Sequence, residues 1–361
     1  MKYSIIVPVF NRPDEVDELL ESLTRQTCRD FEVVIVEDGS EVRCEDVVQR
    51  YANRLPVRYF EKPNSGPGQS RNYGAERSQG EYLIVLDSDV VLPEGYLAAV
   101  DEELTANPCE AFGGPDRAHE SFTSVQKAIN YSMTSFFTTG GIRGGKKKLD
   151  KFYPRSFNMG IKKTLYEALH GFSNMRFGED IDFSIRIFKS GARCRLFPEA
   201  WVWHKRRTDF RKFFRQVHNS GIARINLYKK YPESLKLVHL LPALFTVGVA
   251  TLLAIFLTGL IFAGLGLASA HGASGCNMGL VVTYFGLALM LLALLPLVLY
   301  ATIILVDSAL QNRSVRVGLL SIPASFIQLL GYGTGFLRAW WLRCICGRNE
   351  ELQAFKKTFY K

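Results

Sequence analysis

The spacing of apolar residues divides the chain into two regions. Up to about Arg224, short apolar runs such as 4–9 and 31–36 alternate with segments whose apolar residues recur at helical spacing. Short β-branched runs predict buried strands, and the repeated strand, helix, strand order predicts a parallel sheet covered by helices. By contrast, residues 237–306 contain almost no charged side chain. We therefore expect an α/β domain followed by a helical region in a membrane.

Two carboxylates stand at the end of the apolar run 83–86. Asp87 and Asp89 follow it, separated by Ser88. In open α/β sheets ligands bind beyond the carboxyl ends of the strands. The two charges would repel each other unless a cation lay between them, and hard oxygen ligands suit Mg²⁺ or Mn²⁺ bound partly by a diphosphate. The alternative is a strand that ends in a solvated turn, where Asp and Ser are common.

A third acid, Asp38, follows the apolar run 31–36 and precedes Gly39. A carboxylate at the end of a strand can accept hydrogen bonds from a nucleobase or a ribose, although a lone Asp-Gly pair commonly forms a turn. Further along, residues 64–69 contain two glycines and lead into a predicted helix that carries Arg71. Free amide groups at the start of a helix, together with an arginine, suit a diphosphate.

The order of these segments resembles the nucleotide-binding half of family two glycosyltransferases. The matching segments are Ser4-Ile5-Ile6-Val7-Pro8-Val9-Phe10-Asn11, Val36-Glu37-Asp38-Gly39-Ser40, Gly66-Pro67 with Arg71-Asn72, and Leu86-Asp87-Ser88-Asp89. The resemblance covers about residues 1–220 and implies the GT-A fold, a Rossmann-like and mostly parallel sheet flanked by helices. It also implies a nucleotide-sugar donor, a divalent cation and inversion of the anomeric centre. The family usually has Asp where this chain has Glu37, and the acid at its nucleoside-contacting position is Asp38.

The same resemblance implies roles for individual residues. The donor-binding residues are Pro8, Asp38, Gly66, Arg71, Asp87 and Asn158. Asp180 corresponds to the general base of the family and Glu179 lies on the acceptor side, although acids at the start of a helix can simply complement the helix dipole. His204, just after a predicted strand, either completes a metal site with Asp87 and Asp89 or is structural.

A single base suffices for the implied reaction. An inverting transfer is one in-line displacement, in which the acceptor hydroxyl attacks while the nucleotide diphosphate leaves on the opposite face. Taking the hydroxyl proton is worth roughly 10²–10⁴ in rate, and we assign this role to Asp180. A cation at Asp87 and Asp89 offsets the charge on the leaving diphosphate. A carboxylate nucleophile would imply retention, and the sequence offers no comparable candidate.

Two apolar stretches, 240–263 and 280–306, are each long enough to cross about 30 Å of hydrocarbon. The segment that links them, 269–278, has no Lys or Arg, whereas the following turn contains Arg313 and Arg316. Because basic residues favour the cytoplasmic side, we expect a hairpin that leaves the cytoplasm and returns to it.

A third apolar stretch, 317–337, is interrupted by Pro323 and by Gly331, Gly333 and Gly335. Full crossing would place the basic C-terminal tail outside, against the positive-inside rule. We therefore favour a re-entrant or interfacial segment over a spanning one. The amphipathic, basic helix expected at about 208–228 also suits a membrane surface.

These features predict a GT-A domain over residues 1–235 and a membrane region over 236–361. Within the first, the nucleotide-binding half ends near 115 and the acceptor half begins near 116. Residues 125–137 predict an amphipathic helix, either at the membrane surface or packed on the sheet. The basic loop 138–148 contains Lys146 and Lys147, which either meet an anionic acceptor or belong to a solvated linker.

Composition narrows the class of partner. The net charge is +9, but the chain lacks nucleic-acid-binding signatures, so we assign the excess charge to anionic lipid rather than nucleic acid. Seven scattered cysteines without a Cys-x-x-Cys pattern indicate neither a disulfide framework nor a zinc site. No signal peptide is evident, because Pro8 interrupts the short apolar start. We expect a multi-pass protein of the cell (inner) membrane with a cytoplasmic catalytic domain.

The sequence thus predicts transfer of one sugar to a lipid-linked or polyprenyl acceptor. The Gln-x-x-Arg-Trp signature of processive synthases is absent, since Gln216 is followed by Val-His-Asn-Ser. One alternative is a polyprenyl-phosphate glycosyltransferase, whose phosphate acceptor needs no strong base. The other is a catalytically silent scaffold, against which the joint presence of Asp38, Asp87, Asp89 and Asp180 argues.

Overall fold

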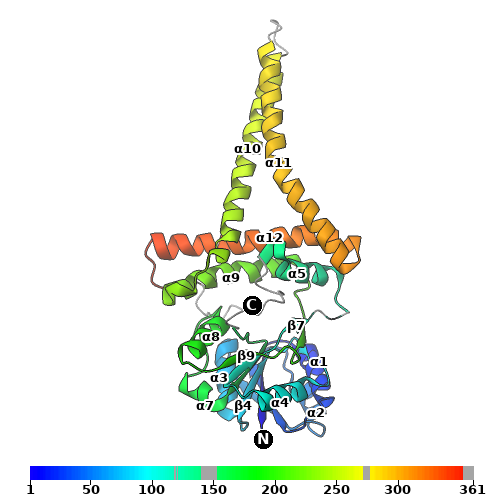
Figure 1. The fold of residues 1–361 in the computed structure, drawn as a ribbon, viewed down its shortest axis with the longest axis vertical. Helices are drawn as coiled ribbons and strands as arrows, with labels where there is room; N and C mark the ends of the chain where they lie inside the picture. Colours follow the sequence, from blue (N-terminus) through cyan, green and yellow to red (C-terminus); the bar gives the residue numbers. More distant parts are fainter. Residues whose placement is uncertain (118, 120, 140–152, 271–276, 353–361) are drawn as a thin grey trace. The chain divides into compact units, whose positions relative to one another are not determined.

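The chain folds into two compact units (Figure 1). The computed structural model describes all 361 residues except 118, 120, 140–152, 271–276 and 353–361. Unit 1 comprises Met1–Phe122, Lys146–Lys205 and Glu350–Lys361, and unit 2 comprises Thr123–Gly145 and Arg206–Asn349. This division differs from the boundary expected near residue 235, because the helices around 124–134 and 210–230 group with the apolar helices.

Unit 1 is built on a seven-stranded sheet with the order β3-β2-β1-β4-β8-β6-β9. Its strands are β1 (Tyr3–Val9), β2 (Phe31–Asp38), β3 (Val57–Lys62), β4 (Tyr82–Leu86), β6 (Ala111–Gly113), β8 (Asn158–Lys162) and β9 (Cys194–Leu196). Strands β1 to β4 run parallel, whereas β8 is antiparallel to both β4 and β6. The predicted α/β fold with a mostly parallel sheet flanked by helices is confirmed.

Helices cover both faces of this sheet. They are α1 (Pro13–Thr24), α2 (Glu45–Tyr51), α3 (Pro67–Arg77), α4 (Tyr96–Ala106), α7 (Lys163–Ala168) and α8 (Glu179–Lys189). Helix α1 shows why they form: Pro13 fixes its first turn, two acids follow it, and Leu19 and Leu23 recur at helical spacing on the buried face.

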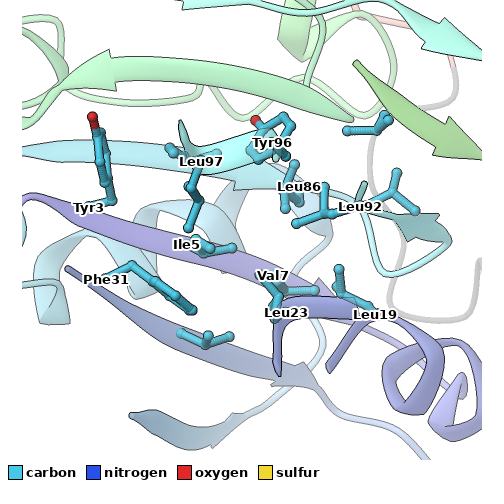
Figure 2. Close-up of a cluster of buried hydrophobic side chains, with 14 of the residues drawn as sticks. Tyr3, Ile5, Val7, Leu19, Leu23, Phe31, Leu86, Leu92, Tyr96 and Leu97 are labelled. Atoms are coloured by element: carbon cyan, nitrogen blue, oxygen red, sulfur yellow. The ribbon is translucent and has the colours of Figure 1, made fainter. Parts of the chain in front are cut away.

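Alternation along the strands feeds two separate cores. Ile5 and Val7 of β1 point into a core that also contains side chains of α1 and α4, as Figure 2 shows. Ile6 points to the opposite face, where it joins a second core with Phe183 of α8. Strands buried on both faces explain why their sequences are continuously apolar rather than alternating.

A second, three-stranded sheet was not anticipated from the sequence. It contains β5 (Val90–Val91), β7 (Asp116–Arg117) and β10 (Val202–His204), in the order β5-β10-β7. The antiparallel register of β10 and β5 pairs His204 with Val90. This pairing brings a residue near position 200 beside the loop that follows β4.

Unit 2 is helical. It contains α5 (Ser124–Thr134), α6 (Phe136–Thr139), α9 (Phe210–Lys230), α10 (Leu241–Ala270), α11 (Asn277–Asn312) and α12 (Val315–Trp340). Helices α10 and α11 contain the two predicted spans. Three segments, Leu237–Ser269, Met278–Asn312 and Val315–Ile345, are long and apolar enough to cross a membrane.

Helix α12 differs from α10 and α11 in its surroundings. Of its most apolar stretch, 39% is buried within the protein, against 6% and 11% for the other two. The glycines of α12 do not break the helix but allow close packing against α9. A Cβ at Gly335 of α12 would overlap the carbonyl of His218, and a Cβ at Gly221 of α9 would overlap the carbonyl of Tyr332. Helices α9 and α12 therefore approach backbone to backbone, and α12 lies crosswise to α10 and α11 (Figure 1).

Candidate functional site

The strand order of unit 1 gathers the predicted donor-side residues at one edge of the sheet. Strand β1 lies between β2 and β4, and all three run parallel. Their carboxyl ends carry Pro8, Asp38 and Asp87, so residues distant in the sequence meet at the crevice where α/β proteins bind ligands. Pro8 is half-buried there, near the end of β1.

Asp87, Asp89 and His204 form a compact group of possible metal ligands. One ligand atom from each lies within 4.8 Å of the other two. His204 Nε2 is 3.2 Å from Oδ1 of Asp89, and the Phe157 ring stacks on the imidazole at 4.8 Å between centroids. Two carboxylates and an imidazole suit Mn²⁺ or Mg²⁺, and all three residues keep partial exposure through which an ion can enter.

Arg12 also faces this group, although the sequence did not single it out. Its Nη1 is 3.5 Å from Oδ2 of Asp89 and 2.5 Å from Oε2 of Glu15. Arg12 comes from the loop between β1 and α1, where Asn11 has a positive φ of 54°. The guanidinium of Arg12 is therefore a positive charge that the protein itself places beside the carboxylate of Asp89.

Asp38 is more buried than a ligand-contacting acid need be, at 2% exposure. Its Oδ1 accepts hydrogen bonds from Lys62 and from the N–H of Ser65, and its Oδ2 accepts the N–H of Gly66 at 2.9 Å. Gly66, with φ of 93°, turns the chain into α3. Asp38 thus shapes the loop before α3, and its predicted contact with a nucleoside stays a prediction.

Arg71 links Asp87, at the end of β4, to Glu179, at the start of α8. It is 3% exposed, and its Nη2 donates to Oδ1 of Asp87 at 2.8 Å. Its Nη1 donates to Oε1 of Glu179 at 3.1 Å, while its guanidinium lies over the Phe172 ring. The carboxyl groups of Asp87 and Glu179 thus each accept a hydrogen bond from this buried guanidinium.

Glu179 and Asp180 begin α8, after Gly178 in the left-handed region. Both are 8% exposed. Burial and the neighbouring Asp180 charge raise the pKa of Glu179 above its ordinary value. Burial also opposes ionisation of Asp180, but Arg155 and Arg71 outweigh it and lower the pKa of Asp180. The environment therefore shifts the pKa values of two adjacent acids in opposite directions, Glu179 toward the neutral form and Asp180 toward the carboxylate.

The remaining predicted residues fall in different places. Asn158 is 1% exposed; its Oδ1 accepts from Tyr96 at 2.7 Å, and its Nδ2 donates to the carbonyl of Ala200 at 2.8 Å. Both polar ends are therefore engaged within the protein. Lys146 and Lys147 lie outside the described residues.

Comparison with known families decides what kind of domain this is. The model of glycosyl transferase family 2 matches residues 4–169, which include the three strand-end acids Asp38, Asp87 and Asp89. The chain thus contains a match to a glycosyl transferase family 2 domain, which lies in unit 1 except for residues 123–145. Asp180 and His204 lie beyond the matched residues.

Two curated relatives share parts of the chain. An uncharacterized glycosyltransferase of Haemophilus influenzae is 33% identical over 194 residues, covering 52% of this chain and 62% of the relative. The Staphylococcus aureus poly(ribitol-phosphate) β-N-acetylglucosaminyltransferase TarS is 39% identical over 93 residues, covering 25% of this chain and 16% of TarS. The chain thus spans less than two thirds of the length of either relative.

A solved structure shares the fold over most of the chain. The mannosyltransferase PcManGT from Pyrobaculum calidifontis, in complex with GDP-Man and Mn²⁺, superposes with a TM-score of 0.53 at 20% identity. The match covers 81% of this chain and 86% of that protein. The shared fold therefore extends beyond the residues that the family model matches.

Proposed function

We propose that this protein is an inverting glycosyltransferase that moves one sugar from a nucleotide-diphosphate sugar to a membrane-associated, lipid-linked acceptor. The observation that supports it most is the meeting of two acid groups through Arg71, which is 2.8 Å from Asp87 and 3.1 Å from Glu179. One group suits a cation and a diphosphate, and the other suits proton transfer. A displacement reaction needs both within reach of one sugar.

The residues divide between the two partners of the reaction. Asp87, Asp89 and His204 would hold Mn²⁺ or Mg²⁺, which when bound offsets the charge on the leaving diphosphate. Pro8, Asp38, Gly66, Arg71 and Asn158 lie on the donor side. Asp180 orients the acceptor hydroxyl and accepts its proton, with Glu179 beside it. Lys146 and Lys147 complete the predicted acceptor side.

Unit 2 supports attachment to a membrane by two spans. An aromatic cluster of Phe245, Tyr300 and Phe326, with centroids 5.4 to 5.7 Å apart, joins α10, α11 and α12. From Phe245 to the end of α10 at Ala270 the helix rises about 38 Å at 1.5 Å per residue, which exceeds the roughly 30 Å of a hydrocarbon layer. In this proposal α12 lies along the inner membrane surface and unit 1 is cytoplasmic.

The alternative enzyme is a polyprenyl-phosphate glycosyltransferase. Its acceptor would be an anion, which the two cations beside Asp180, Arg155 and Arg71, would attract. Because a phosphate needs no strong base, Asp180→Asn would then keep substantial activity, whereas a hydroxyl acceptor requires the carboxylate.

The test is sugar transfer in membranes that contain the full-length protein. UDP-N-acetylglucosamine, UDP-glucose and GDP-mannose, each labelled in the sugar, are supplied with Mn²⁺, with Mg²⁺ or with EDTA, and the lipid extract is counted. We expect label in lipid from one donor, only with a divalent cation, and not with Asp89→Ala. Transfer that persists in EDTA and in Asp89→Ala would refute the metal assignment; no transfer from any donor would count against the activity.

Topology is tested by labelling single cysteines in intact cells. A cysteine at Ser274, in the expected external link, should react with an impermeant reagent, whereas one at Ser314, between α11 and α12, should react only after lysis. The reverse pattern would overturn the orientation, and a C-terminus outside the cell would mean that α12 crosses the membrane.

A further inference from the structure

The carboxylate of Asp180 is bonded at both oxygens. Its Oδ1 accepts the N–H of Ile181 at 2.9 Å, and its Oδ2 accepts Nε–H of Arg155 at 2.6 Å. Asp180 is 8% exposed, and its side chain meets a guanidinium that is itself about one-third exposed. A desolvated carboxylate favours its neutral form, so a direct cation is what allows it to stay ionised.

Arg155 is presented from a fixed backbone. The carbonyl of Pro154 accepts the hydroxyl of Ser184 in α8 at 2.6 Å, and the carbonyl of Arg155 accepts the N–H of Asn158 at 3.0 Å. Asn158 is in turn fastened by its side chain to α4. The segment before β8 is therefore bonded at one end to α8, which carries Asp180, and at the other end to β8 of the central sheet.

Within the described part of the chain, three charged groups face Asp180 from the elements packed against it. They are Arg155 before β8, Arg71 from α3 and Glu179 from α8 itself. Arg71 divides its two terminal nitrogens between Asp87 and Glu179. Of the cations that the structure describes, Arg155 is therefore the one that contacts Asp180 directly.

We propose that Arg155 is a positioning residue, which holds the Asp180 carboxylate ionised and in one orientation for the acceptor hydroxyl. This inference rests on the proposed function, in which Asp180 is the base. In that step the acceptor oxygen bonds to the anomeric carbon, the bond to the diphosphate breaks with its electrons going to the diphosphate, and the hydroxyl proton moves to Asp180. In this proposal Arg155 acts through Asp180, to which it is bonded, and not by direct contact with the sugar or the diphosphate.

The test compares pH profiles of kcat/KM for Arg155→Gln, Arg155→Lys and a matched control. The control is Arg193→Gln, which removes an exposed pair with Glu110 in the same unit. A base works above its pKa, so the acid limb of the profile reports Asp180. Loss of the charge should raise the pKa of Asp180 by about one to three units. The defect of Arg155→Gln is then greatest near pH 5 and small near pH 8, Arg155→Lys recovers part of it, and Arg193→Gln matches wild type.

A uniform loss at every pH would mean that Arg155 only supports the fold, and would overturn the inference. A second measurement needs no substrate: thermal unfolding of Arg155→Gln in the wild-type and Asp180→Asn backgrounds. The substitution should lower Tm in wild type above the unfolded pKa of Asp180, less as pH falls through its folded pKa, and hardly at all in Asp180→Asn. Equal losses in both backgrounds would also overturn it.

These outcomes separate this inference from the function on which it rests. If wild type transfers no sugar from the three donors, the proposed function fails. If wild type is active and Asp180→Asn is not, but the Arg155→Gln profile is unshifted, the function stands and the inference about Arg155 fails.

Discussion

Two pairs of acids in unit 1 are close in the fold but differ in their surroundings. Asp87 and Asp89 lie in the loop after β4, with side chains 31% and 13% exposed, and share their space with the imidazole of His204. Glu179 and Asp180 begin α8, with side chains 11% exposed, and each is bonded to an arginine.

The difference shows that neighbours, rather than residue type, decide what a carboxylate does. The open pair presents oxygen atoms to a shared space that suits a divalent cation. Arginines reach both pairs, since Arg71 also bonds Asp87 and Arg12 lies near Asp89, but among the described residues it is the open pair that an imidazole joins to form a set of three ligand groups. At the buried pair we therefore expect the proton, rather than a metal, to be the exchangeable species. The substitutions below remove one side of this contrast at a time.

The largest expected effect is in the buried pair. Asp180→Asn should lower transfer by roughly 10²–10⁴, because it removes the group that takes the acceptor proton. Glu179→Gln should cost much less, since burial raises the pKa of Glu179 to about 7 and a large share of this side chain is then neutral near neutral pH. The measurement is kcat for sugar transfer with saturating donor. Equal losses for the two variants would contradict the division of roles.

The open pair is tested by its dependence on Mn²⁺. Asp89→Ala should lose metal-stimulated turnover, while His204→Ala should need a higher Mn²⁺ concentration but keep activity at saturation. The measurement is the rate of nucleotide-diphosphate release across a Mn²⁺ titration. If His204→Ala follows the wild-type curve, the imidazole is not a ligand and its contacts with Asp89 and Phe157 are structural.

How much of this the sequence could predict depends on the range of the interactions. Each strand-end acid was found because an apolar run and the acid that follows it are local signals, and Asp180 was found by resemblance. Arg155 gave no such signal, since its partner lies 25 positions away and a charged loop residue has no periodicity. The internal bonding of Asp38 was missed for the same reason, because its donors come from the loop after β3.

The order in which the strands pair could also not be predicted from the sequence pattern. In strand β8 the sequence singled out only Asn158, as a donor-binding residue, and the antiparallel place of β8 between β4 and β6 depends on partners far along the chain. Residues 125–137 left two alternatives open, at a membrane or on the sheet. In the structure, α5 groups with α12 and the other helices of unit 2 rather than with the sheet.

A smaller effect is expected on stability. The folded state raises the pKa of Glu179, so it binds more protons than the unfolded state between the two pKa values, and stability falls as pH rises through that interval. Glu179→Gln mimics the neutral form, so its Tm relative to wild type should rise with pH. Calorimetry at several pH values measures this, and a difference independent of pH would contradict it.

The smallest expected effect concerns Arg12, which approaches Asp89 at 3.5 Å. A partly exposed pair of this kind is worth about 0.2–1 kcal/mol. Arg12→Ala should therefore tighten Mn²⁺ binding only a few-fold, by removing a competing cation. Isothermal titration with Mn²⁺ checks this, and weaker binding in the variant would mean that Arg12 supports the site instead.

The contrast between the two acid pairs is tested most directly by measuring Mn²⁺ binding to the full-length protein in detergent, with electron paramagnetic resonance as the detection method. Wild type and Asp180→Asn should bind the ion with the same affinity, and Asp89→Ala should not bind it. Loss of binding in Asp180→Asn together with retention in Asp89→Ala would contradict the account.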